Sequence, residues 1–460
     1  MLHATTLLLL PLAAIAAPLE SRQHDHGAAT GGTGATGGAA GAGSAGAAGG
    51  SSGLAGLLGG SGGEGGSSGL AGLFGKGSGS GGSGGLAGLL GGGSNGSSPF
   101  AGLFGGGDPL TPFKTYELEP KIRKDAKRVK YAWGPYELLG ASADKPAGSF
   151  SMDPNGQSFM SSVTGVAGPA AVLAGKVGLM YEDGCEANIE TGIYTHHILT
   201  RATGKKDVPF VGRCPTEDGK PANSSSGLSS LLAGLNIGSG FIGAGEDNGN
   251  EPNMYTNSDG TYPSAFNIAA GEKFSAQLDL VNYKETTQKL YITFDIEYLE
   301  GSAENDATSA LLSVTGCGAD PIATSKDGPA STKSKKWGIL SDGYIVSAKG
   351  HLHDGGDKMV LFLNDKEVCT SEAIYGGAGG TTTINGKEWE MLNGMSQCSN
   401  SIAVKAGDYI SMEAFYDLAK HPLREDQGGA GHDDGHSLGI MGMFSLSYAA
   451  GGASSNSTAA

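Results

Sequence analysis

Three features are scarce in this chain of 460 residues, and each scarcity excludes a class of protein. No apolar run reaches the roughly 20 residues that a membrane-spanning helix needs, so we expect no membrane span. The chain has 5 cysteines but no Cys-x-x-Cys pair, which argues against a thiolate zinc site. Acidic side chains outnumber basic ones by 46 to 30, and the net charge of −16 argues against a nucleic-acid partner.

The N-terminus carries the pattern of a cleavable signal peptide. Residues 1–17 contain an apolar run that is too short to span a bilayer, and it ends in the small-x-small sequence Ala14-Ile15-Ala16. We therefore expect a secreted protein that is extracellular or associated with a cell wall. Sequons for N-linked glycosylation at Asn95, Asn223 and Asn456 agree with secretion and predict a glycoprotein.

Glycine is in large excess at 83 residues, and most of it lies in residues 18–108. This segment cannot bury enough apolar surface to offset the entropy of the chain, so we expect a disordered, low-complexity arm. A Gly-Leu-Ala-Gly-Leu unit begins at Gly53, Gly69 and Gly85. Two interpretations stay open: a plain tether, which the composition favours, and a weak docking segment that attaches the protein to a cell wall.

The remaining chain has the pattern of an all-β protein. Apolar and polar residues alternate strictly in residues 274–280 and 290–298, which is typical of half-buried strands. Asn385-Gly386 between two short strand-like runs is the strongest hairpin signal, and Asn364-Asp365 is a weaker one. Strands and turns at this spacing predict antiparallel sandwiches.

The length beyond the arm suffices for two domains. We expect two tandem antiparallel, jelly-roll-like β-sandwiches, the N-terminal one over residues 109–260 and the C-terminal one over residues 261–450. A disordered tail is expected over residues 451–460. The basic segment at residues 121–130 leaves two interpretations open, a patch that binds anions or wall polymer and, as the favoured one, a solvated edge of the first domain.

The cysteines should mostly be paired in an oxidising compartment. We expect the disulfides Cys185–Cys214 and Cys369–Cys398, with Cys317 left free. Sequence alone does not establish this connectivity.

Two tight histidine pairs stand out among the 10 histidines. Residues i and i+2 of a strand point to the same face, so His351 and His353 can form a two-imidazole platform for a metal. Two ordinary exposed histidines are an equally open interpretation of this pair alone. His196 and His197 diverge on a regular strand, and they could share one ion only if the backbone bends or opposite ring nitrogens are used.

A late methionine strengthens the metal interpretation. Met441 and Met443 alternate with the apolar residues Ile440 and Phe444, so the two thioethers point away from that apolar face. Two imidazoles and a thioether make a soft ligand set that suits copper, Cu(I) in particular. The alternative is that the methionines fill gaps under a second sheet.

The order of these motifs resembles known families over about residues 115–448. The chain is similar to the stress-up-regulated nodulin family and its fungal relatives in five stretches: Val281-Asn-Tyr, Gly343-Tyr-Ile, Gly350-His-Leu-His-Asp-Gly-Gly, Ala373-Ile-Tyr-Gly-Gly and His421-Pro-Leu-Arg. The Tyr-Thr-His-His sequence, the His-x-His strand and the late methionine resemble, more distantly, the peptidylglycine α-hydroxylating and dopamine β-monooxygenase copper family.

The distant resemblance implies copper as the cofactor, with one ion on each sandwich. The oxygen-binding copper would fall on His351, His353 and Met441. The electron-transfer copper would fall on His196 and His197 only, because its third histidine has no counterpart. Lys349 stands where that family has a substrate-binding arginine. An external reductant such as ascorbate is implied as well.

We therefore expect a secreted type-2 copper-binding protein that acts as a copper-dependent monooxygenase with an incomplete second copper site. A non-catalytic extracellular or cell-wall protein on the same scaffold is the alternative, and the missing histidine favours it. Copper storage without turnover is a third interpretation. Copper–zinc superoxide dismutases and cupins also contain His-x-His, but the further histidines that they need are absent here.

Overall fold

A computed structural model describes residues 108–145, 156–220, 239–245, 251–317, 322, 328–377, 380–384, 387–423 and 440–451. Several sequence predictions lie outside these residues: the signal peptide, the glycine-rich arm up to residue 107, the tail from residue 452, and the sequons at Asn95, Asn223 and Asn456. None of the helices in the described part of the chain has the length and apolar character needed to cross a membrane.

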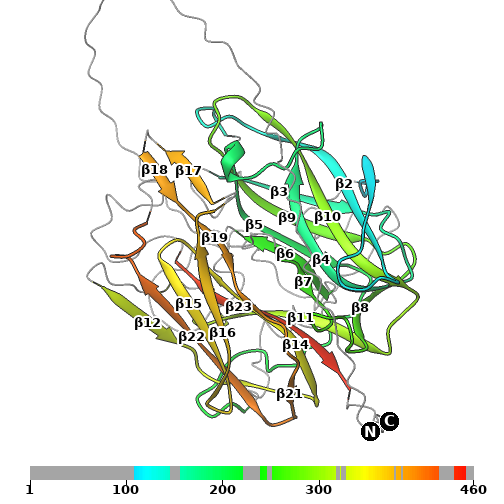
Figure 1. Cartoon of the computed structure of the whole chain (residues 1–460), viewed down its shortest axis with the longest axis vertical. Coiled ribbons are helices and arrows are strands. Elements are labelled where there is room, and N and C mark those ends of the chain that lie inside the picture. Colours follow the sequence, from blue (N-terminus) through cyan, green and yellow to red (C-terminus); the bar gives the residue numbers. More distant parts are fainter. Residues whose placement is uncertain are drawn as a thin grey trace, which may run out of the picture. The chain divides into compact units, whose positions relative to one another are not determined.

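The regular structure of the described chain is almost entirely β-strand, which confirms the all-β fold (Figure 1). The first half comprises β1 (Lys114–Leu118), β2 (Lys127–Leu138), β3 (Gly156–Val163), β4 (Ala170–Met180), the 3₁₀ turn η2 (Ile189–Thr191), β5 (Ile193–Ala202), β6 (Ser239–Gly245), β7 (Asn253–Met254), β8 (Ser264–Ile268), β9 (Phe274–Asn282) and β10 (Gln288–Glu300).

The second half comprises β11 (Asn305–Ser313), β12 (Pro329–Lys333), β13 (Trp337–Gly338), β14 (Gly343–Leu352), β15 (Gly356–Leu363), β16 (Lys366–Tyr375), β17 (Thr381–Ile384), β18 (Lys387–Glu390), β19 (Leu392–Met395), β20 (Gln397–Cys398), β21 (Ile402–Val404), β22 (Tyr409–Asp417) and β23 (Gly442–Ala450).

One large sheet runs through both halves. Its 11 strands follow the order β1-β2-β10-β4-β8-β11-β23-β14-β20, with β7 beside β4 and β21 beside β14. A sheet of 4 strands, β3-β9-β5-β6, belongs to the first half, and a sheet of 6 strands, β12-β22-β15-β16-β19 with β13, belongs to the second. The expected antiparallel pairing holds for the described strands except at β8 and β11, which are parallel over a short stretch.

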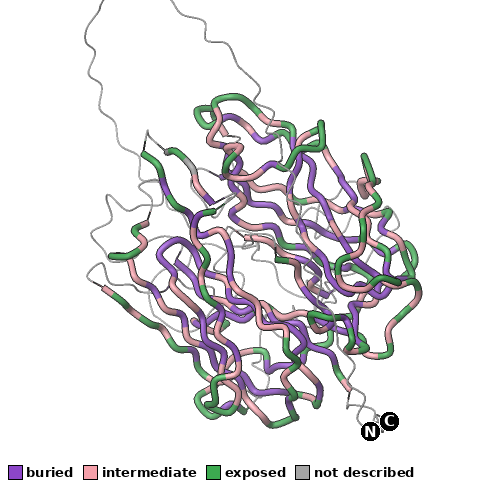
Figure 2. Tube along the Cα trace, viewed as in Figure 1, coloured by how far each residue is buried: buried purple, intermediate pink, exposed green. Residues whose placement is uncertain are grey.

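Each half has its own hydrophobic core, and the buried residues follow the middle of the strands (Figure 2). Trp133, Leu278 and Phe294 are fully buried in the first core, while Leu352 and Phe444 are fully buried in the second. Burying a side chain of this size stabilises the fold by about 1.5–3 kcal/mol. β8, β9 and β10 follow residue 260 in the chain and pack into the first core. The expected domain division at residue 260 stays a prediction.

Both hairpins expected from turn residues are present. β17 and β18 pair in register on either side of Asn385-Gly386, which themselves lie outside the described residues. Asn364 and Asp365 join β15 to β16 with φ values of 50° and 63°, the left-handed conformation that this tight turn requires.

The predicted disulfide Cys185–Cys214 and the predicted free Cys317 are wrong. Cys369 and Cys398 are joined as expected, but Cys214 pairs with Cys317 and Cys185 is the free, exposed cysteine. The chain that follows β5 leaves the first half, because Phe210 is buried in the second core and stacks on Tyr448 at a ring distance of 4.3 Å. This packing carries Cys214 to the end of β11 and away from Cys185.

Candidate metal centre

A bulge in β5 brings the adjacent histidines together. The register between β5 and β9 shifts between Thr195 and His197, so His196 is an extra residue in the strand. A bulge bends a strand and changes the direction of its side chains. The rings of His196 and His197 therefore lie 4.3 Å apart, whereas on a regular strand they would point to opposite faces.

The second histidine pair lies at the end of β14. Ala348 and Leu352 face the second core, so the alternation of the strand places Lys349 and His351 on the opposite face. His353 follows the strand directly. The turn after it requires Gly355, whose φ is +93° and whose hypothetical Cβ would lie 2.4 Å from the side chain of Leu418.

A buried tyrosine of β22 fixes the position of His353. The backbone N–H of His353 donates to the hydroxyl of Tyr416 over 3.1 Å, and this hydroxyl donates to the backbone oxygen of Met441 over 2.6 Å. Tyr416 is 2% exposed, so neither hydrogen bond competes with bulk water. The phenol therefore ties the turn after β14 to the residue that precedes β23.

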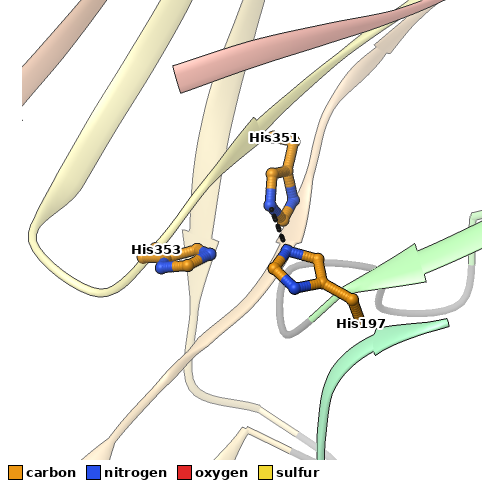
Figure 3. Close-up of side chains that lie close together, drawn as sticks. All are labelled: His197, His351 and His353. Carbon is orange, nitrogen blue, oxygen red and sulfur yellow. Dashed lines mark hydrogen bonds between the residues drawn. The ribbon is translucent and has the colours of Figure 1, made fainter. Parts of the chain in front are cut away.

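The two histidine pairs meet between the halves, and Figure 3 shows His197 of one pair beside His351 and His353 of the other. The Nε2 atoms of His197 and His351 are 3.3 Å apart, and His197, His351 and His353 each offer a ring nitrogen within 4.8 Å of the other two. The ring of His196 completes the histidine cluster at 5.2 Å from the ring of His353. We use this name for His196, His197, His351 and His353. The first half thus supplies the imidazole that the His-x-His strand lacks.

This geometry fits one metal ion. Two nitrogens bound at about 2.0 Å to a tetrahedral metal lie about 3.3 Å apart, the distance found between His197 and His351. The Nδ1 atom of His197 is buried without a hydrogen-bond partner among the described residues. Imidazole nitrogens suit copper, zinc, iron and nickel, so the three rings could hold any of these ions.

The environment keeps His197 in its metal-binding form. Burial, and after it the neighbouring imidazoles of His196, His351 and His353, hold the pKa of His197 well below its ordinary value. The ring is therefore neutral at neutral pH. Neutral imidazole is the form that binds a metal, so no proton has to be displaced from this ring at neutral pH.

A buried carboxylate supports the cluster from β9. The Nδ1 atom of His196 lies 3.2 Å from Oδ2 of Asp279, and both side chains are buried. A carboxylate that accepts from Nδ1–H fixes the tautomer and the orientation of an imidazole, as it does in many metal sites. His196, His197 and Asp279 also form a second group of potential ligands.

Sequence reasoning missed Asp279 and Tyr416. Asp279 occupies a polar position in the alternating pattern of β9 and carries no further signal, because only the register with β5 places it beside His196.

Met441 is buried and Lys349 is 7% exposed. The ligand role of Met441, the substrate role of Lys349 and the number of ions all stay predictions.

Part of the chain is similar to known proteins. Residues 300–423 match the family described as Stress up-regulated Nod 19. "Probable copper-dependent oxygenase clz3" of Cochliobolus lunatus is 24% identical over 253 residues, which cover 54% of this chain and 72% of that protein. "Probable copper-dependent oxygenase M1" of a Phoma species is 24% identical over 253 residues, which cover 54% of this chain and 58% of that protein.

Among solved structures, a crystal structure of peptide-N(4)-(N-acetyl-β-D-glucosaminyl) asparagine amidase is similar at 8% identity over 70% of this chain and 96% of that one. The TM-score of 0.30 is too low for any argument. The distant resemblance to the two-copper monooxygenases stays a prediction. The nearer resemblance is confirmed: the chain is similar to the stress up-regulated Nod 19 family and to fungal proteins that are named as probable copper-dependent oxygenases.

Proposed function

We propose that the protein is a copper-dependent oxygenase that holds a single copper ion between its two halves. The observation that carries the proposal is the approach of His197 to His351, with their Nε2 atoms 3.3 Å apart and His353 beside them. The three rings alone do not select copper. Copper is proposed because two relatives are named as copper-dependent oxygenases.

The chain's own residues would fix the ligand geometry. His197, His351 and His353 would each present a neutral ring nitrogen, and Asp279 would orient His196 next to them. Copper, when bound, supplies the redox chemistry with dioxygen by which an oxygenase oxidises its substrate. The electrons would come from an external reductant such as ascorbate.

Two further residues would complete the site. His351 is in register with Met443 on β23 and Leu352 with Gly442, so the next step of this antiparallel register would set His353 opposite Met441. We propose Met441 as an additional thioether ligand that favours Cu(I). Lys349 lies two residues before His351 on the same strand face, which would place its ammonium group beside a bound substrate.

The test is the copper content of the full chain, together with the variants His351→Ala and His421→Gln. His421 is the matched control, because it stacks on Tyr375 and contributes to neither group of potential ligands among the described residues. We expect one copper per chain in the wild type and in His421→Gln, and none in His351→Ala. Zinc added in equal amount should not displace the copper, since copper binds nitrogen ligands more tightly.

Turnover distinguishes an oxygenase from a protein that only binds copper. With ascorbate and dioxygen, the copper-loaded wild type should consume oxygen and His351→Ala should not. Copper binding without oxygen consumption would favour a non-catalytic extracellular protein or a copper store. A wild type that retains no copper would refute the metal site itself.

We also propose that the chain is secreted and glycosylated. The signal-peptide pattern of residues 1–17 and the two disulfides support secretion, since disulfides persist in oxidising compartments. Sequencing the N-terminus of the protein recovered from culture medium tests whether residues 1–17 are removed. Enzymatic deglycosylation followed by mass measurement tests Asn95, Asn223 and Asn456.

A further inference from the structure

The first half carries a cavity of about 290 Å³ that none of the described histidines lines. It lies over β2, β10 and β4, on the face of the large sheet opposite to the first core. The register sets Asp295 of β10 directly between Lys130 of β2 and Lys176 of β4. An outward sheet face thus presents a row of alternating charges across three strands.

The basic segment at residues 121–130 forms one wall of this cavity. The carboxylate of Glu297 accepts hydrogen bonds from the backbone N–H groups of Lys121, Ile122 and Arg123 at 2.6, 2.8 and 2.8 Å. Glu297 is 4% exposed, so these three bonds hold the segment firmly against β10. Lys121, Arg128 and Lys130 line the cavity as a result.

Most of the lining charges are already neutralised. Arg128 donates from Nε and Nη2 to the two carboxylate oxygens of Asp295 at 2.8 and 2.7 Å. Glu297 is satisfied by backbone donors, and Lys176 lies 3.9 Å from Glu186. Within the part of the chain that the structure describes, no ion pair involves Lys121 or Lys130. Among the described residues, four cationic and three acidic side chains line the cavity, which leaves one net positive charge.

The floor of the cavity is shielded from water. Burial is the main reason why the pKa of Lys176 lies below its ordinary value, and the side chains of Arg128 and Asp295 are only 19% and 14% exposed. Charge pairs in such a place are stronger than on an open surface. The volume lies just below the range for small-molecule sites, which is roughly 300–1,000 Å³, so we expect a ligand as small as a single sugar ring.

We propose that this cavity binds a sugar acid, with its carboxylate beside Lys121 and Lys130 and its hydroxyl groups on the carboxylates of Glu186 and Asp295. A single negative charge matches the one net positive charge of the lining. The acidic residues repel a compact dianion such as phosphate, but they accept hydrogen bonds from hydroxyl groups. A sugar acid carries both features, whether it is free or ends a polysaccharide.

Calorimetric titration of the full chain tests the proposal with galacturonate, trigalacturonate, glucose and inorganic phosphate. We expect galacturonate to bind at least ten times more tightly than glucose or phosphate. The variant Lys130→Gln should weaken galacturonate binding at least tenfold. The control Lys127→Gln, on the same strand but paired with Glu300 outside the cavity, should leave the affinity unchanged. If trigalacturonate binds more tightly than galacturonate, the occupant is the end of a polysaccharide. If the two bind with equal affinity, the occupant is a free sugar acid.

Three results would overturn the proposal. The first is that neither sugar acid binds, and the second is that glucose or phosphate binds as tightly as galacturonate does. The third is an equal loss of galacturonate affinity in Lys130→Gln and Lys127→Gln. Thermal melting of both variants shows whether either one fails to fold, and Lys176→Gln offers a second variant in that case. The same titration with His351→Ala should give the wild-type affinity, because none of the histidines of the cluster lines the cavity.

Discussion

The Nε2 atoms of His197 and His351 lie 3.3 Å apart although the residues are separated by 154 positions in the chain and belong to different halves of the protein. Among the residues that the structure describes, neither half alone offers three imidazoles to one metal ion. The distant resemblance implied one copper on each sandwich, whereas the structure gathers both histidine pairs at one place. A metal ion bound there would connect β5 to β14, so metal binding and the association of the halves should be coupled.

The first prediction concerns the number of ions. His197→Ala and His351→Ala should each lose the bound copper completely, because each removes one of the three histidine ligands of the same ion. The double variant should lose no more than either single variant. Metal analysis after gel filtration measures the copper content. If each single variant kept one of two ions and the double variant kept none, the single-copper proposal would be wrong.

The second prediction concerns the carboxylate behind His196. Asp279→Asn should weaken copper binding by about tenfold, the low end of the effect known for the carboxylate partner of a metal-ligating histidine, because His196 lies beside the three proposed ligands and is not one of them. Competition with a chelator measures the affinity. Ser158→Ala is the matched control, since it removes only a longer hydrogen bond, 3.3 Å, to the same carboxylate. Equal affinities in wild type and Asp279→Asn would mean that His196 plays no part in the site.

Local signals in the sequence predicted much of the fold. The alternation in residues 274–280 and 290–298 gave β9 and β10, because a strand with one buried face repeats every two residues. Asn364-Asp365 predicted a hairpin because few residues adopt positive φ at low cost. These features depend on neighbours in the chain, and they could be inferred without knowing the rest of the molecule.

The arrangement of the candidate site depended on contacts between distant segments. No residue type announces the bulge at His196, and the approach of β5 to β14 follows from the packing of two separate cores. The wrong disulfide has the same origin. Cys185 and Cys214 are close in sequence, but the burial of Phe210 in the second core carries Cys214 to Cys317.

The third prediction concerns the hydroxyl of Tyr416. Tyr416→Phe removes the partner of the His353 N–H and of the Met441 carbonyl, at a cost of about 1–3 kcal/mol for each buried group. Urea unfolding measures the loss of stability, and chelator competition should show weaker copper binding because the turn that holds His353 loosens.

Tyr448→Phe is the control for Tyr416→Phe. The hydroxyl of Tyr448 donates to the backbone oxygens of Ser341 and Asp342 at the opposite end of β14 from His351. Its loss should destabilise the fold to a similar extent and leave the copper affinity unchanged. If both variants bound copper as the wild type does, Tyr416 would be a purely structural residue.

The last prediction concerns the free cysteine. Cys185 is exposed, and the neighbouring carboxylate of Asp183 raises the pKa of its thiol, first by accepting its hydrogen bond and then by repelling the thiolate. Only the thiolate reacts with iodoacetamide, so alkylation of the native protein should be slow at pH 7 and accelerate as the pH rises. Asp183→Asn lowers the pKa of the Cys185 thiol toward its ordinary value and should speed the reaction at pH 8.

Peptide mapping should find Cys185 alone modified without reduction, because Cys214 is bonded to Cys317 and Cys369 to Cys398. Modification of Cys317 instead would contradict the observed pairing.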